Sequence, residues 1–185
     1  MATTSTTPDA FGLKAPDFAL PATDGNSYGI GDLRGVRGLV VVFICNHCPY
    51  VIGIAERLVQ DAAALHALGF GFVAINANDA KAYPDDSFEN MKLFAHKHSF
   101  NFPYLYDADQ SIARAYGAVC TPDFFGYDAH LGLQYRGRID RFGRNPRPQG
   151  EPSELLEAMR HVSRTGQGPE GQMPSIGCSI KWRDA

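Results

Sequence analysis

Two cysteines, Cys45 and Cys48, are separated by two residues where an apolar run meets a predicted helix. The run 39–44 shows no polar alternation, which is typical of a strand buried on both faces of a parallel sheet. The helix is expected to begin at or near Pro49. The unpaired N–H groups and the dipole of a helix N-terminus favour an anion, and a thiolate is one. The spacing therefore predicts a nucleophilic cysteine of low pKa at this junction.

A Cys-x-x-Cys pair has three interpretations. It can be a redox dithiol, half of a zinc site completed by Cys120, Cys178 or His47, or a pair of inert buried thiols. The sequence has no second Cys-x-x-Cys and no other pair with ligand spacing, so redox chemistry is favoured and no metal is predicted.

Within the dithiol, Cys45 at the strand end is predicted to be the more exposed, attacking thiol, with Cys48 as the resolving thiol. His47 lies between them, and a partly positive imidazole would lower the pKa of the thiolate.

The composition describes an ordinary globular chain. Its 185 residues are 44% hydrophobic and 20% charged, with a formal net charge of −3. That charge gives no reason to expect a nucleic-acid or membrane partner, and no apolar run reaches the length of a membrane span. Residues 1–12 are expected to be a disordered tail without signal-peptide architecture, residues 13–163 one domain, and residues 164–185 a C-terminal tail that packs on it. The protein is expected in the cytoplasm.

Alternating strand and helix signals predict an α/β fold. After the segment 39–44 and its helix, strands are expected at 70–77 and 102–106, and a helix is expected to follow 86–89, where Asp86-Ser-Phe-Glu89 is similar to a capping box. Residues 124–127 and 133–139 are joined too tightly to be parallel, so they must pair antiparallel. A final helix contains Leu155, Leu156, Met159 and Val162.

Together these residues resemble the thioredoxin-fold redoxin superfamily, and in particular its peroxiredoxin-like members related to alkyl hydroperoxide reductase (AhpC/TSA). The segment 15–21 with Asp24-Gly25 resembles the family's N-terminal hairpin, Cys45-Asn-His-Cys48-Pro49 its active site, and Thr121-Pro122 its cis-proline loop. The C-terminal stretch 177–182 is similar to that of peroxiredoxin-like members. The resemblance implies a thioredoxin-like fold, which is a central mixed β-sheet flanked by helices, with an N-terminal β-hairpin extension and a C-terminal tail.

The resemblance also assigns roles around the dithiol. Thr121 and Pro122 would present a backbone edge to which a substrate chain pairs as a strand. Cys120, two residues before Pro122, would rim this groove. Cys120 and Cys178 are candidates for additional redox thiols, although free cysteine more often packs as a small apolar residue.

The sequence departs from the family patterns in two ways. Thioredoxins bury an acid behind the dithiol, but the strand 39–44 carries no carboxylate, and Glu56 is a weak candidate for that role. Peroxiredoxins place a threonine three residues before the reactive cysteine, where this chain has Cys45, and they add an arginine, for which Arg138 and Arg141 are candidates.

The function predicted from the sequence is thiol-disulfide oxidoreductase. A peroxiredoxin-like thiol peroxidase (an antioxidant role) is the first alternative, and a zinc- or partner-binding module on the same fold is the second. The chemistry needs no cofactor, because the electrons reside on sulfur. The expected partners are a disulfide-containing protein or a small-molecule thiol or peroxide, together with an external thiol as electron donor.

Overall fold

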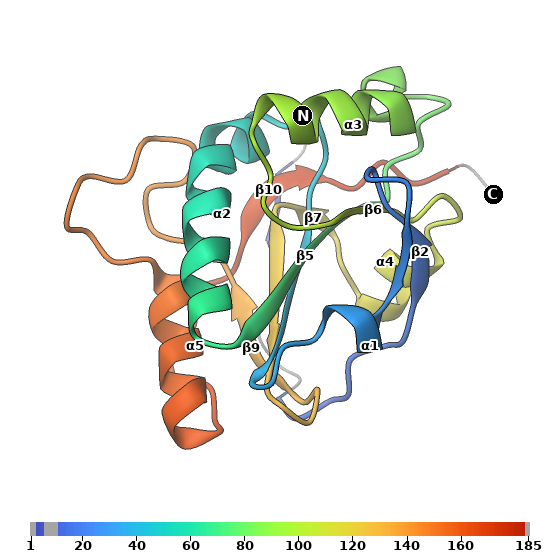
Figure 1. The fold of residues 1–185 in the computed structure, drawn as a ribbon. Helices are drawn as coiled ribbons and strands as arrows, with labels where there is room; N and C mark the ends of the chain where they lie inside the picture. Colours follow the sequence, from blue (N-terminus) through green and yellow to red (C-terminus); the bar gives the residue numbers. More distant parts are fainter. Residues whose placement is uncertain (1–2, 6–10, 184–185) are drawn as a thin grey trace.

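A five-stranded mixed sheet forms the centre of the computed structural model, which describes residues 3–5 and 11–183 (Figure 1). The strand order is β6-β5-β4-β8-β9. Strands β4, β5 and β6 are parallel, whereas β8 pairs antiparallel with both β4 and β9. The strands are β4 (Gly38–Phe43), β5 (Phe70–Asn76), β6 (Tyr104–Tyr106), β8 (Asp123–Tyr127) and β9 (Leu133–Gly137). The predicted thioredoxin-like α/β fold is confirmed.

Helices cover both faces of this sheet. Helices α2 (Pro49–Ala67), α3 (Phe88–Lys97) and α5 (Glu154–Thr165) contribute to the apolar core on one face. Helix α4 (Ser111–Tyr116), the short α1 (Ile30–Leu33) and the hairpin of β2 (Ala19–Pro21) and β3 (Ser27–Gly29) pack on the other. A 3₁₀ turn, η1 (Pro84–Asp86), precedes α3.

The sequence of β4 explains its central position. All six of its residues are buried. Val40 and Val42 face the core that contains α2, whereas Val41 and Phe43 face the opposite core. A strand covered on both faces needs apolar residues at every position, and this is why the run lacks alternation.

A second, smaller sheet joins three distant parts of the chain. Strand β10 (Ile176–Ser179) pairs antiparallel with β7 (Cys120–Thr121) on one side and with β1 (Thr3–Ser5) on the other. Strand β1 differs from the disorder expected over residues 1–12, of which residues 1, 2 and 6–10 lie outside the described part. Its partner β10 supplies pairing that the sequence alone does not reveal.

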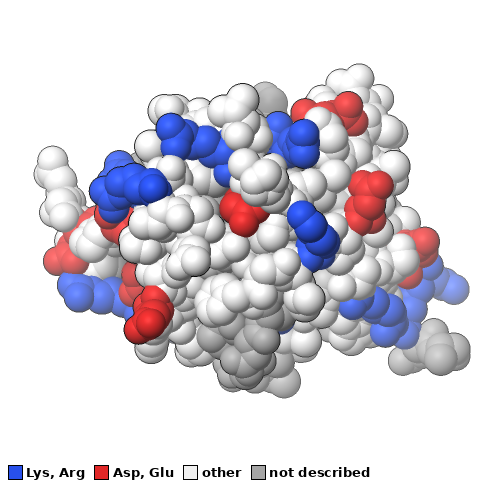
Figure 2. All heavy atoms as spheres, turned by 90° about the horizontal axis from the view of Figure 1, so that it is seen from below, with Lys and Arg blue, Asp and Glu red and all other residues white. Residues whose placement is uncertain are grey.

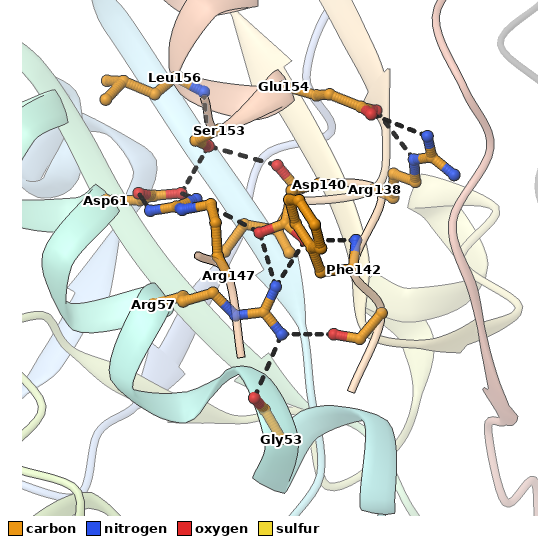
Figure 3. A network of polar contacts seen from close by, with 12 residues as sticks. Gly53, Arg57, Asp61, Arg138, Asp140, Phe142, Arg147, Ser153, Glu154 and Leu156 are labelled. Carbon is orange, nitrogen blue, oxygen red and sulfur yellow. Dashed lines mark hydrogen bonds and ion pairs between the residues drawn. The ribbon is translucent and has the colours of Figure 1, made fainter. Parts of the chain in front are cut away.

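A buried ionic network joins α2 to the segment after β9 and to the start of α5 (Figure 3). Arg57 donates to both carboxylate oxygens of Asp140, at 2.5 and 2.6 Å. Arg147 contacts Asp140 at 3.3 Å and Asp61 at 2.8 Å. Ser153, the N-cap of α5, donates to Asp61 at 2.6 Å. Because both carboxylates are buried and paired, the network holds the segment between β9 and α5 against α2.

On the face shown in Figure 2, basic and acidic side chains are interspersed. Among the described residues, no helix combines the length and the apolar character needed to span a bilayer.

Candidate active site

The dithiol lies at the carboxyl end of β4, where the sheet meets α2. Cys48 is the N-cap of α2, and Pro49 takes the first helical position, where the missing N–H costs nothing. Cys45 is 1% exposed and Cys48 is fully buried. Cys45 was expected to be the more exposed of the two thiols, but both are buried, so exposure does not distinguish them.

Thr121 contacts both cysteines. Its hydroxyl oxygen lies 3.3 Å from the Cys45 sulfur, and its carbonyl oxygen lies 3.2 Å from the Cys48 sulfur. The peptide bond between Thr121 and Pro122 is cis. The structure thus brings together Cys45, Cys48 and the Thr121-Pro122 loop, which are some 75 residues apart in sequence.

The two thiols differ in their electrostatics. Hydrogen bonds from the Cys45 thiol, from Cys178 and from the backbone N–H of Val51 outweigh burial and lower the pKa of Cys48 to about 4. The hydrogen bond with Cys48, burial and the charge of Asp86 raise the pKa of Cys45 well above its usual value. These shifts make Cys48, at the helix N-terminus, the more acidic thiol of the pair, whereas the sequence assigned the attack to Cys45.

Asp86 is a buried acid beside the dithiol that the sequence did not reveal. It is fully buried and accepts hydrogen bonds from the backbone N–H of Asn46 at 2.7 Å and from the side chain of Asn78 at 2.8 Å. Burial alone would raise the pKa of Asp86, but the contacts with His47, Asn78 and Asn46 lower it below its usual value. The capping-box pattern hid this role, since the N-cap of α3 is Ser87.

His47 pairs with this carboxylate. Its Nδ1 atom lies 2.7 Å from Asp86 Oδ2, and its ring lies nearly parallel to that of Tyr83, with centroids 5.8 Å apart. The contact with Asp86 raises the pKa of His47 against the opposing effect of partial burial. The hydrogen bonds that lower the pKa of Cys48 come from other groups, so tuning of the dithiol by His47 stays a prediction.

The two additional cysteines lie close to the dithiol in different settings. Cys120 is buried, its sulfur is 3.6 Å from the carbonyl oxygen of Pro122, and burial raises its pKa. The sulfur of Cys178 lies 3.0 Å from that of Cys48. Burial and the hydrogen bond with Cys48 raise the pKa of Cys178 to about 11. Of the two, Cys178 is the one whose sulfur contacts that of Cys48.

One cluster of the described residues has the donor types of a metal site. Donor atoms of Cys45, His47 and Asp86 all lie within 4.8 Å of one another. Tetrahedral structural zinc uses four protein ligands, and both carboxylate oxygens of Asp86 already accept hydrogen bonds from Asn46 and Asn78. The geometry fits a carboxylate–imidazole pair beside a thiol better than a closed zinc site.

A cavity of about 210 Å³ opens beside the cis-proline. Pro122, Tyr50 and Ile176 contribute to its apolar lining, and Arg138 and Arg141 also line it. Arg138 forms two hydrogen bonds with Glu154, and Arg141 pairs with Glu151. The two arginines considered for a peroxide site are thus engaged with carboxylates of the α5 region.

Comparison with known proteins identifies the family. The profile of the AhpC/TSA family matches residues 11–141. The chain belongs to the AhpC/TSA family. A crystal structure of a conserved protein from Geobacillus kaustophilus superposes with a TM-score of 0.88 at 43% identity, over 100% of this chain and 98% of the other.

Two curated relatives with assigned names are more distant. A Mycobacterium tuberculosis protein provisionally named a peroxiredoxin is 29% identical over 164 residues, which cover 89% of this chain and 91% of the relative. A thiol-disulfide oxidoreductase of Geobacillus thermodenitrificans is 27% identical over 129 residues, 68% of this chain and 67% of the relative. The chain is thus a peroxiredoxin-like member of the redoxin superfamily, with relatives named for two thiol chemistries.

Proposed function

We propose that this protein catalyses thiol–disulfide exchange through Cys45 and Cys48. The observation that carries the proposal is the pair of unlike thiols at the N-terminus of α2, where the Cys45 thiol hydrogen-bonds to Cys48 and the pKa of Cys48 is about 4. A thiolate beside a protonated partner thiol is the arrangement that a two-step exchange requires. The relative named a thiol-disulfide oxidoreductase supports this assignment.

In the proposed reaction Cys48 attacks a substrate disulfide. One substrate sulfur leaves as a thiolate, and the other remains in a mixed disulfide with Cys48. Cys45 then attacks the Cys48 sulfur, its proton passes to the departing substrate thiolate, and the Cys45–Cys48 disulfide forms. An external thiol, which a reducing cytoplasm contains, returns the pair to the dithiol. The roles of attacking and resolving thiol are thus exchanged relative to the sequence expectation.

Peroxide reduction is a second candidate, favoured by the burial of the sulfurs. Cys45 and Cys48 are at most 1% exposed, so a small peroxide can approach them more readily than a folded protein disulfide can. The Cys48 thiolate would displace an alkoxide or hydroxide from the peroxide and become a sulfenic acid, which Cys45 would convert to a disulfide with loss of water. Arg138 and Arg141, the arginines considered for a peroxide site, pair with Glu154 and Glu151 and line the cavity beside Pro122.

The exchange reaction is tested by a single turnover with bis(2-hydroxyethyl) disulfide. The reduced protein is mixed with one equivalent, quenched in acid, alkylated and mapped by mass spectrometry. The wild type and the Cys120→Ser control should release two thiols per disulfide and contain linked Cys45 and Cys48. Cys48→Ser should release no thiol above the rate of an uncatalysed reaction. Full release by Cys48→Ser would overturn the proposal.

The peroxidase candidate is tested with hydrogen peroxide and dimedone, which traps sulfenic acids. Peroxide consumption with a dithiol donor, at a rate comparable with disulfide turnover, would support it, as would a dimedone adduct on Cys48 in Cys45→Ser/Cys178→Ser, which lacks both thiols in contact with Cys48. If peroxide reacts no faster with the protein than with free cysteine, this candidate is excluded.

A further inference from the structure

Strand β10 fills the backbone edge at which a substrate chain is expected to pair. Cys178 is the register partner of Thr121, and Ser179 is the partner of Cys120, in an antiparallel ladder. Antiparallel pairing of an added strand with an exposed edge is a common mode of peptide recognition. The protein's own C-terminal segment therefore takes the place of a bound peptide next to the dithiol.

The approach of β10 to this edge depends on a glycine. A Cβ atom added to Gly177 would lie 2.0 Å from the carbonyl oxygen of Thr121 and 2.6 Å from its carbonyl carbon, both rigid backbone atoms. Beyond β10, the N–H of Ile180 donates to the carbonyl of Val119 at 3.1 Å, and the carbonyl of Lys181 accepts from Asp79 at 2.9 Å. The segment is thus fitted closely against the site over several residues.

The pairing of β10 with β7 places the Cys178 sulfur in contact with the Cys48 sulfur. The sulfurs of Cys48 and Cys178 are 3.0 Å apart, and a disulfide bond of about 2.05 Å needs a further approach of about 1 Å. Cys48 therefore touches two thiols, Cys45 in its own loop and Cys178 on β10. Both partners are almost fully buried, so neither is a surface thiol that meets Cys48 by chance.

We propose that Cys178 is an internal exchange partner of the dithiol, presented to Cys48 by strand β10 in the manner of a substrate strand. The proposal rests on the proposed thiol–disulfide exchange, which generates the Cys45–Cys48 disulfide. Cys178, as the thiolate, attacks the Cys48 sulfur; the Cys45–Cys48 bond breaks and a Cys48–Cys178 bond forms. Cys45 leaves as a thiolate and takes up the proton that Cys178 gave. No electrons enter or leave, because one disulfide replaces another.

The surroundings of the three sulfurs fit this step. The hydrogen bond with Cys48 that raises the pKa of Cys45 is lost in the disulfide, but burial and the charge of Asp86 still raise it, which favours protonation of the displaced Cys45 thiolate and opposes the reverse attack. Burial and then the hydrogen bond with Cys48 raise the pKa of Cys178, and the second of these effects disappears once the Cys48 sulfur is in a disulfide. The charge of Lys181 acts in the direction that favours the Cys178 thiolate.

The test uses the full chain and the same small disulfide. In the wild type, peptide mapping after one turnover should find a Cys48–Cys178 linkage beside the Cys45–Cys48 linkage. Cys45→Ser should still release two thiols per disulfide and end as Cys48–Cys178, and Cys45→Ser/Cys120→Ser should behave identically. Cys45→Ser/Cys178→Ser should stop after one thiol, as a mixed disulfide on Cys48.

A second variant tests the role of β10 without removing a sulfur. Gly177→Ala in the Cys45→Ser background should reduce the yield of the Cys48–Cys178 linkage at least tenfold, because the added Cβ collides with Thr121. The proposal is overturned if Cys45→Ser stops at the mixed disulfide on Cys48 to the same extent as Cys45→Ser/Cys178→Ser does. This conclusion requires that the wild type forms the Cys45–Cys48 linkage in the same experiment. If the wild type forms neither a Cys45–Cys48 nor a Cys48–Cys178 linkage, the proposed function itself fails, and the exchange as written fails with it.

Discussion

The pH dependence of folding offers a quantitative test of the Cys48 thiolate. The pKa of Cys48 is about 4 in the folded protein, whereas an unfolded cysteine titrates near pH 8.5. Between these values the folded state holds a thiolate and the unfolded state a thiol. A pKa lowered by folding contributes stability that is fully present above the unfolded pKa and is lost as the pH falls towards the folded pKa.

The magnitude follows from a difference of one bound proton. The free energy of unfolding should rise by about 1.4 kcal/mol per pH unit from this group, or about 4 kcal/mol between pH 5 and pH 8. Cys48→Ser removes the group, so the difference in unfolding free energy between wild type and variant should grow with pH at that slope. Other titrating groups largely cancel in the difference.

The assay is urea unfolding followed by circular dichroism at pH 5, 6, 7 and 8, with a phosphine reductant present. Cys120→Ser is the matched control: burial raises the pKa of Cys120, so its thiol stays protonated in the folded state and its difference from wild type should be nearly constant over pH 5–7. A wild-type minus Cys48→Ser difference that does not change with pH would refute the reasoning. A pH-dependent slope for Cys45→Ser instead would place the thiolate on Cys45.

Two further predictions concern buried carboxylates. Asp86→Asn should lower the pKa of His47, measured by NMR titration, because the contact with Asp86 raises that pKa. The control Asp85→Asn changes the exposed neighbouring position and should leave the His47 titration as in the wild type. An unchanged His47 titration in Asp86→Asn would contradict the pairing. Asp140→Asn should destabilise the protein by about 3–5 kcal/mol, since it leaves the buried Arg57 with an uncompensated charge while Arg147 keeps Asp61, and should lower the melting temperature by about 10 °C in calorimetry. Glu157→Gln breaks an exposed ion pair and should lower the free energy of unfolding by less than about 1 kcal/mol. Equal losses of unfolding free energy in Asp140→Asn and Glu157→Gln would show that the buried network stabilises the protein no more than an exposed pair does.

Local patterns were sufficient to predict the elements around the dithiol. The unbroken apolar run identified β4, and the helical spacing from Val51 to Leu65 identified α2. The Asp24-Gly25 turn identified the β2–β3 hairpin. These features depend on residues that are close together in the sequence, so their physical signal is contained in a short window.

The unpredicted parts of the site depend on distant pairing. Asp86 matched a helix-capping pattern, and nothing in its neighbourhood indicates that the backbone of Asn46, 40 residues earlier, donates to it. The contact between Cys48 and Cys178 spans 130 residues and exists only because β10 pairs with β7. The relative acidity of Cys45 and Cys48 also depends on these contacts, so the residues next to the dithiol in the sequence do not determine which thiol is the more acidic.

The position of β10 also has a consequence for biosynthesis. Cys178 is made 57 residues after Thr121, which at about 5–20 residues per second corresponds to a delay of roughly 3–11 s. During that interval the sheet, α2 and the dithiol can assemble on the ribosome while the edge at Thr121 has no strand beside it. The nascent protein therefore passes through a stage in which the Cys48 thiolate is less shielded from solvent than in the complete fold. At that stage a disulfide or peroxide in solution reaches the thiolate more easily.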